Sequence, residues 1–227
     1  MRGGFGFARM LKDKIPPHPS PQPRKAGARG KEGFSMLIVL ADNLFTVAGI
    51  LSPAECVAMI ERGESIGFEP ASVRTLGGRQ MRNDIRDNDR AEFDDPTFAA
   101  MLWERCRPFV PDELESGTAI GFDTNFRFYR YDPGQRFERH RDRIVKRSPT
   151  VRTRLTCLVY LNDDFGGGET TFYGERTTGL DRPELVRVTP VAGMALFFLH
   201  EWVHSGLSVE SGRKYVLRSD VFFEWNE

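Results

Sequence analysis

Three residues in the C-terminal half of the sequence have the types and spacing to hold one metal ion. His140 and Asp142 form a His-x-Asp pair, His204 follows far downstream, and a basic residue, Lys214, comes ten positions after His204. Two imidazoles and one carboxylate on one face of an ion leave the opposite face open. That is the facial arrangement of non-haem Fe(II) oxygenases. The pattern therefore predicts an iron site with free positions for reactants.

A second motif overlaps these residues. The segment His200-Glu201-Trp202-Val203-His204 matches His-Glu-x-x-His, the motif of zinc metalloproteases. That chemistry needs a helix, so that both histidines share a face while the glutamate activates a zinc-bound water. Here residues 193–199 indicate a buried strand, and Ser205-Gly206 ends the segment. The zinc protease stays an alternative; otherwise His200 is a substrate-pocket residue, a residue beside the ligands or a satisfied core histidine.

Length and composition indicate one globular domain with a terminal extension. The chain has 227 residues, of which 40% are hydrophobic and 28% charged. Residues 1–35 carry eight of the 32 Lys/Arg and two of the 32 Asp/Glu, so the remainder has 24 basic against 30 acidic residues. This acidic balance predicts no nucleic-acid partner. No apolar run approaches the length of about 20 residues that a membrane helix needs. Three widely spaced cysteines favour a reducing, cytoplasmic setting.

The N-terminal segment differs in composition from the rest. Residues 1–35 are basic and rich in Gly and Pro, including Ile15-Pro16-Pro17-His18-Pro19, so we expect a disordered tail. Such a tail is either a targeting or nucleic-acid segment or an extension with no role. Met36 precedes an apolar strand-like run and is a candidate start. We expect the domain to span residues 36–227.

Two helices and then a series of strands are predicted. Ser52-Pro53-Ala54-Glu55 is a capping box for a helix to about Ser65, and Asp95-Pro96 opens a second helix. The charged stretch 73–90 between them is either a solvated surface or a lid over the substrate. About eight short strands follow from Phe122, which indicates an α+β protein with a barrel or sandwich.

Five sequence blocks resemble one known family. In order they are Tyr131-Asp132-Pro133-Gly134-Gln135-Arg136-Phe137-Glu138-Arg139-His140-Arg141-Asp142, Leu158-Val159-Tyr160-Leu161-Asn162, Gly167-Gly168-Glu169-Thr170-Thr171-Phe172, Pro190-Val191-Ala192-Gly193-Met194-Ala195-Leu196-Phe197-Phe198, and His204-Ser205-Gly206 with Val209, Gly212 and Lys214. This series resembles the prolyl 4-hydroxylase-like dioxygenases, which depend on 2-oxoglutarate and Fe(II). The resemblance covers about residues 120–223.

The resemblance implies a double-stranded β-helix, or jelly-roll, barrel with N-terminal supporting helices. It also implies Fe(II) on His140, Asp142 and His204, 2-oxoglutarate as cosubstrate, and ascorbate as a further candidate cofactor. The activity it implies is hydroxylation of a C–H bond with release of succinate and CO₂. The substrate is then a prolyl or other peptidyl residue, a free amino acid or another small metabolite. A metal-free binding barrel is the remaining alternative.

Other residues have more than one interpretation. Lys214 begins an apolar strand, where a buried ammonium needs a partner such as the distal carboxylate of 2-oxoglutarate; a surface lysine is the alternative. Arg218 shares its strand face and is the second candidate for that anchor. In the family a tyrosine at the position of Tyr131 binds the same carboxylate, whereas a plain core aromatic is the other reading. Arg127 and Tyr129 are candidates for substrate contact if they face the cavity.

Overall fold

The computed structural model describes residues 35–75, 78–80, 84–174 and 182–226. The predicted tail lies outside these residues except for Ser35, so its disorder is a prediction that the structure does not address. Two helices and 18 strands are formed in the described part of the chain. The helices are α1 (Pro53–Ile66) and α2 (Pro96–Cys106).

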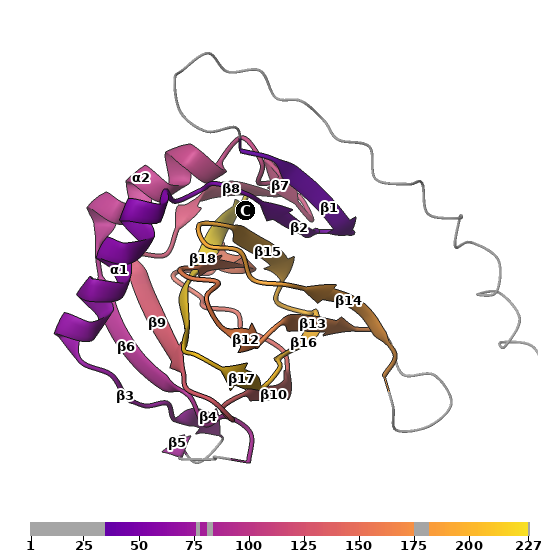
Figure 1. Cartoon of the computed structure of the whole chain (residues 1–227). Helices are drawn as coiled ribbons and strands as arrows, with labels where there is room; N and C mark the ends of the chain where they lie inside the picture. Colours follow the sequence, from indigo (N-terminus) through magenta and orange to yellow (C-terminus); the bar gives the residue numbers. More distant parts are fainter. Residues whose placement is uncertain (1–34, 76–77, 81–83, 175–181, 227) are drawn as a thin grey trace, which may run out of the picture.

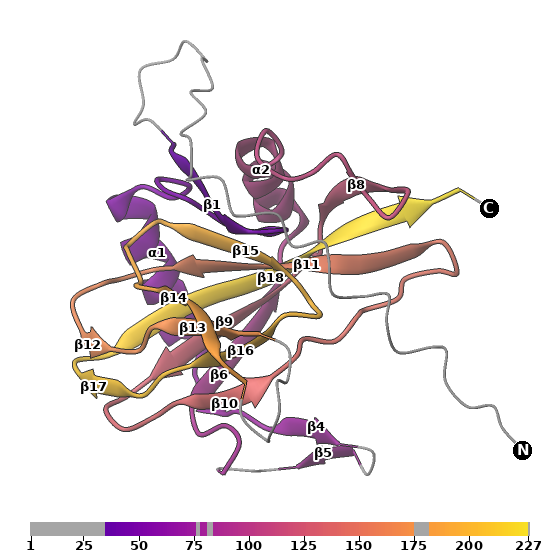
Figure 2. The same cartoon turned by 90° about the vertical axis from the view of Figure 1, so that its right-hand side faces the viewer.

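Most strands belong to one large antiparallel sheet (Figures 1 and 2). The strand order across it is β1, β2, β15, β11, β18, β9, β6 and β3. In addition, β8 pairs with β18, and β7 pairs with β8. Their bounds are β1 (Leu37–Ala41), β2 (Leu44–Val47), β3 (Glu69–Pro70), β6 (Asp89–Asp94), β7 (Glu113–Leu114), β8 (Gly117–Phe122), β9 (Asn125–Tyr131), β11 (Val151–Tyr160), β15 (Ala195–Leu199) and β18 (Lys214–Trp225).

A smaller sheet faces the large one and completes a double-stranded β-helix, as predicted. Its strand order is β10, β16, β13 and β14, and two two-stranded ribbons accompany it, β12 with β17 and β4 with β5. The bounds are β4 (Val73–Thr75), β5 (Gly78–Gln80), β10 (Phe137–His140), β12 (Gly166–Gly167), β13 (Thr170–Tyr173), β14 (Glu184–Val188), β16 (Val203–Gly206) and β17 (Val209–Ser211).

Both helices lie on the side of the large sheet that faces away from the small one (Figure 1). The capping box predicted for α1 is formed, since the Ser52 side chain accepts from the Glu55 backbone N–H while Glu55 accepts from the Ser52 backbone N–H. Asp95 caps α2 by accepting from the backbone N–H of Phe98. Buried side chains of α2 pack with Phe126 in the core beneath the helices.

Side chains alternate along β9 between two hydrophobic cores. Phe126 and Phe128 point to the helix side of β9, whereas Tyr129 and Tyr131 belong to the core between the two sheets. On the neighbouring β18, Lys214 pairs with Tyr131. Since side chains two apart share a face, polar groups of β9 and β18 project together into the space between the sheets.

About eight strands were predicted from Phe122 onward, and ten, β9 to β18, are formed in the described part of that region. The strands expected over residues 193–199 and from Lys214 correspond to β15 and β18, but very short strands such as β12, β16 and β17 were not foreseen. A strand that short carries too few residues for alternation to be read. Neither helix of the described chain combines the length and apolar character required to cross a bilayer.

Candidate metal and cosubstrate site

Two short strands bring the distant histidines together. His140 ends β10 and His204 lies on β16, and these residues are direct partners in the antiparallel register of the two strands. A strand would place Asp142, two residues after His140, on the same face, and the His-x-Asp spacing favours this arrangement. In the structure Asp142 lies two residues beyond the end of β10 instead. Its backbone N–H donates to the carbonyl of His200 at 3.1 Å, which holds the chain as it leaves the strand. The prediction of proximity is correct although the predicted reason was wrong.

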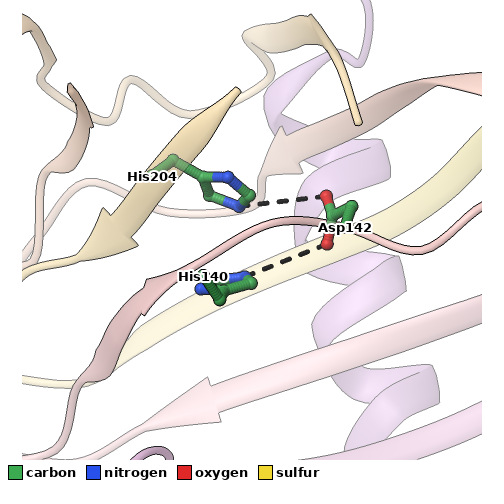
Figure 3. A group of neighbouring side chains, drawn as sticks. All are labelled: His140, Asp142 and His204. Carbon is green, nitrogen blue, oxygen red and sulfur yellow. Dashed lines mark ion pairs between the residues drawn. The ribbon is translucent and has the colours of Figure 1, made fainter. Parts of the chain in front are cut away.

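The three side chains converge on one point (Figure 3). His140 Nε2 lies 3.9 Å from Asp142 Oδ1, and His204 Nε2 lies 3.8 Å from Asp142 Oδ2. One ligand atom from each residue falls within 4.8 Å of the others. Two nitrogens and one oxygen at this spacing can bind the same ion, and the donor set suits Fe(II) with open positions.

Backbone carbonyls fix the orientation of both imidazoles. His140 Nδ1 is 2.7 Å from the carbonyl oxygen of Glu138, and His204 Nδ1 is 3.0 Å from that of Trp202. Because each Nδ1 donates its hydrogen there, each Nε2 keeps a free lone pair. Burial lowers the pKa of His140 to about 3, with the nearby His204 acting in the same direction. Burial likewise lowers the pKa of His204, so both rings are neutral and able to bind a metal.

The carboxylate of Asp142 is held by two donors from the large sheet. Arg218 Nη1 donates to Oδ1 at 2.6 Å, and Thr156 Oγ1 donates to Oδ2 at 2.6 Å. Burial opposes ionisation of Asp142, but the Arg218 guanidinium and the two imidazoles outweigh it and hold the pKa well below its usual range. Asp142 is therefore a preorganised anion facing the two Nε2 atoms.

Asp220 and Arg127 extend the ion pair between Asp142 and Arg218 along the large sheet. Arg218 Nη2 donates to Asp220 Oδ1 at 3.1 Å, and Arg127 bonds the other oxygen of Asp220. Arg127 was a candidate for substrate contact, but it does not line the cavity described below. Arg218, the second candidate for the 2-oxoglutarate anchor, already contacts two carboxylates. The structure thus gives both arginines a role in supporting Asp142.

A cavity of about 400 Å³, including its open mouth, adjoins the three candidate ligands. Lys214 reaches it from the first position of β18, is 3% exposed, and among the described residues donates to the carbonyl of Gly168 alone, at 2.6 Å. Burial lowers its pKa to about 7. The cavity is lined by Tyr129, Tyr131, Phe137, His140, Asp142, Leu158, Thr170, His204, Gly206, Lys214, Val216 and Arg218.

Two tyrosines flank the Lys214 ammonium. Its Nζ lies 5.2 Å from the ring centre of Tyr131 and 5.5 Å from that of Tyr160. The Tyr160 hydroxyl bonds Thr170 Oγ1 at 2.7 Å, and burial raises the pKa of both phenols above their ordinary value. Both tyrosines are therefore neutral, and the Lys214 ammonium between them makes no ion pair within the described part of the chain. Such a group favours an acidic ligand.

Tyr129 occupies a distinct electrostatic position in the same cavity. Burial raises the pKa of its phenol, but the guanidiniums of Arg218, Arg86 and Arg127 outweigh that effect and lower the pKa to about 8.

Arg86 comes from the charged stretch 73–90, which was predicted to be surface or lid. Its residues 76–77 and 81–83 lie outside the described part of the chain, but Arg86 is 6% exposed and packs against the rings of Tyr129 and Phe137.

The zinc protease geometry is not formed. Residues 200–202 make a turn that leads into β16 rather than a helix. His200 is buried, and its two ring nitrogens each lie 2.9 Å from the hydroxyl of Thr156 or Thr153. Glu201 pairs with Arg154 at 2.9 Å. His200 is thus a satisfied core histidine: its carbonyl accepts from the Asp142 backbone N–H, and its ring is linked to the Asp142 carboxylate through Thr156.

Several residues of the site were not foreseen. Thr156 and Asp220 lie on strands read as apolar, and Arg86 lies in a stretch read as a charge run. A signal was present for Asp220, since its separation of two from Arg218 places both on one strand face. No comparable signal existed for Arg86, whose burial depends on the bridge between its own backbone and Phe137 of β10.

Comparison with known proteins agrees with this geometry. Residues 126–219 match the family model described as the 2OG-Fe(II) oxygenase superfamily. The matched segment begins on β9 and ends on β18, so it contains all three candidate metal ligands and Lys214. A search of curated proteins gave no match.

Solved prolyl hydroxylases share the fold. A viral collagen prolyl hydroxylase from Paramecium bursaria Chlorella virus-1 aligns with a TM-score of 0.53 and 22% identity over 78% of this chain and 94% of the other. A Pseudomonas putida prolyl-4-hydroxylase aligns with a TM-score of 0.57 and 22% identity, over 82% of this chain and 94% of the other. A Trichoplax adhaerens prolyl hydroxylase was solved with a peptide fragment of hypoxia inducible factor. It aligns with a TM-score of 0.60 and 16% identity, over 80% of this chain and 84% of the other.

Residues 126–219 thus resemble the 2OG-Fe(II) oxygenase superfamily, and the three candidate ligands have the donor set of an Fe(II) site. The fold of the chain is that of the prolyl hydroxylases named above.

Proposed function

We propose that His140, Asp142 and His204 bind Fe(II), and that Lys214 anchors the distal carboxylate of 2-oxoglutarate. The observation that supports the first assignment most directly is the convergence of three ligand atoms within 4.8 Å of one another. For the second, it is a buried ammonium that bonds a carbonyl but no carboxylate in the described chain. Arg218 is the weaker candidate for the anchor because Asp142 and Asp220 already neutralise it.

The reaction that follows is hydroxylation of a C–H bond. One molecule each of 2-oxoglutarate, O₂ and substrate R–H gives succinate, CO₂ and R–OH. Bound iron supplies the oxidising chemistry. Asp142, fixed by Arg218 and Thr156, presents a carboxylate of constant orientation, while the two imidazoles present Nε2. Lys214 holds the cosubstrate by its far end, and Tyr131 adds a neutral hydroxyl beside it.

The substrate is the least defined part of the proposal. Prolyl residues of peptides are one candidate, because the structural relatives named above are prolyl hydroxylases. Free amino acids and other small metabolites are the second, since fold alone does not define a substrate. We also infer a reducing, cytoplasmic setting, which is supported by three buried cysteines that form no disulfide. Ascorbate would act as an accessory reductant.

The test is a direct assay of metal, cosubstrate and product. Anaerobic protein should bind one Fe(II) per chain, and in air it should convert 2-oxoglutarate to succinate with hydroxylation of one candidate substrate, followed by mass spectrometry. Parallel reactions with and without ascorbate test the reductant. Protein that binds neither Fe(II) nor 2-oxoglutarate would favour the metal-free binding barrel. Restoration of activity by zinc together with loss of activity in Glu201→Gln would favour the protease.

A further inference from the structure

One buried cation near the candidate iron site, Arg86, forms no ion pair with the described residues. Arg86 Nε donates to the neutral side chain of Asn88 at 2.6 Å, while its Nη2 is buried and bonds no described residue. Its guanidinium carbon lies 4.3 Å from the ring centre of Tyr129 and 4.6 Å from that of Phe137. Both rings line the cavity. A buried guanidinium held in this way is unfavourable unless an anion completes its environment.

The phenol beside it is also without a partner. Tyr129 lines the cavity, and its hydroxyl makes no hydrogen bond with the described residues, whereas the Tyr160 hydroxyl bonds Thr170. In the strand register Tyr129 faces Val216, which lies between Lys214 and Arg218 on β18. A free donor therefore stands in the cavity on the Arg218 side of the proposed 2-oxoglutarate anchor.

The charges in this corner do not balance. Arg86, Arg127 and Arg218 lie around Tyr129, and Asp142 and Asp220 oppose them. Adding Fe(II) and dianionic 2-oxoglutarate changes nothing in this count, since their charges cancel, and the nearby carboxylate of Glu169 offsets the charge of Lys214. The site loaded with metal and cosubstrate therefore keeps an excess of positive charge, which favours an anionic substrate.

We infer that Tyr129 and Arg218, which line the cavity, form a subsite for a carboxylate of the substrate, and that Arg86, stacked on the Tyr129 ring outside the lining, adds positive charge to it. The substrate is then a small carboxylic acid, such as a free or N-acylated amino acid, rather than an internal residue of a peptide. The carboxylates of 2-oxoglutarate have other places, one at Lys214 and one at the iron. This inference rests on the proposed function.

The test compares acids with their matched amides. Protein loaded with Zn(II) and 2-oxoglutarate, which cannot turn over, is titrated with free and N-acetylated amino acids and with the corresponding C-terminal primary amides, and binding is followed by saturation-transfer NMR. Iron-loaded protein is then assayed for hydroxylation of the same compounds. We expect the preferred acid to bind at least about tenfold more tightly than its amide, because a charge-assisted hydrogen bond is lost.

Three variants locate this preference. Tyr129→Phe should weaken the acid but not the amide, and Arg86→Gln should remove most of the preference. Arg152→Gln is the matched control, because Arg152 also stacks on an aromatic ring, Trp225 at 3.8 Å, but lies away from the cavity. Tyr129→Phe removes a hydroxyl without a partner, so it keeps the test available if Arg86→Gln fails to fold.

Each other result contradicts the inference in a recognisable way. Equal binding of acids and amides, or preference for amides, would indicate a peptide-linked substrate while leaving the proposed function intact. Weakened 2-oxoglutarate binding in Tyr129→Phe or Arg86→Gln, measured by calorimetry, would assign the subsite to the cosubstrate. Loss of metal affinity alone in Arg86→Gln would make Arg86 a support for Phe137, which stacks on His140 at 3.6 Å. Failure to bind Fe(II) and 2-oxoglutarate at all would instead refute the proposed function.

Discussion

Arg218 Nη1 lies 2.6 Å from Asp142 Oδ1, so a guanidinium donates a hydrogen bond to one carboxylate oxygen of a proposed iron ligand. The Arg218 side chain is 9% exposed and that of Asp142 is 3% exposed, so both charges are removed from water. The contact keeps the carboxylate ionised and aimed, but it also competes with a metal for the same electron density. Arg218 therefore influences both the stability of the empty site and its affinity for metal.

Replacement of Arg218 should separate these two effects. Arg218→Met leaves Asp142 and Asp220 buried with one partner fewer, and breaking such a pair typically costs ~3–5 kcal/mol. We expect a loss of that size in urea unfolding of metal-free protein. Stabilisation by Zn(II) should be larger in the variant than in the parent, because the metal replaces the missing cation.

A matched arginine provides the control for this prediction. Arg154 also pairs with two carboxylates, Glu115 and Glu201, but these acidic side chains are 62% and 51% exposed. Arg154→Met should cost no more than ~1 kcal/mol for the lost surface pairs. A similar loss in both variants would show that the buried contact of Arg218 has no special energetic role.

The metal ligands should differ sharply from the neighbouring histidine. His140→Ala, Asp142→Ala and His204→Ala should each abolish Fe(II) binding and turnover. His200→Ala should keep iron affinity within about a factor of ten. That is the lower limit of the loss usually seen when a residue that hydrogen-bonds to a metal ligand is replaced. It should also be less stable, since two buried hydrogen bonds to threonines are lost. Equilibrium dialysis with metal analysis measures the affinities, and loss of iron by His200→Ala would show that the ligand set was misassigned.

This contrast also shows where sequence reasoning succeeded. The five ordered blocks were sufficient to predict the barrel and the convergence of His140, Asp142 and His204, and the apolar strand that begins at Lys214 indicated a buried ammonium there. Alternation along β9 and β18 was readable because those strands have seven and 12 residues. Arg127 was assigned to the right strand but to the wrong environment, because its contact with Asp220 depends on the register between two strands.

The remaining parts of the site depend on relationships with no local signal. Asp142 reaches its position through a backbone hydrogen bond to His200, which lies 58 residues away in the sequence. The burial of Arg86 follows from bridges between the stretch 84–88 and β10. Neither composition nor periodicity encodes such contacts, so a polar residue in a charged stretch is read as solvated until the fold is known.

Lys214 and Arg218 should have separate roles in cosubstrate binding. Lys214→Ala removes the proposed partner of a desolvated carboxylate, a change that typically costs ~2–5 kcal/mol, or roughly thirty-fold to several thousand-fold in affinity. The Michaelis constant for 2-oxoglutarate should rise accordingly, with iron affinity little changed. Lys214→Arg should retain part of the affinity because it keeps the charge. If Arg218→Met destroyed 2-oxoglutarate binding while Lys214→Ala did not, the anchor would belong to Arg218.

Binding of 2-oxoglutarate should be coupled to proton uptake at Lys214. Burial lowers the pKa of Lys214 from 10.5 to about 7, so above pH 7 the amine of the empty protein is mostly neutral. A bound carboxylate favours the ammonium, so binding near pH 8.5 should take up close to one proton, and affinity should fall about tenfold for each further pH unit. The folded pKa lies below the unfolded value, so the empty protein should also gain stability as pH rises from about 7 to 10.5. Calorimetry of the binding in buffers of different ionisation enthalpy measures the uptake. Lys214→Arg, whose guanidinium stays charged, should take up none, and equal proton uptake in the two proteins would place the titrating group elsewhere.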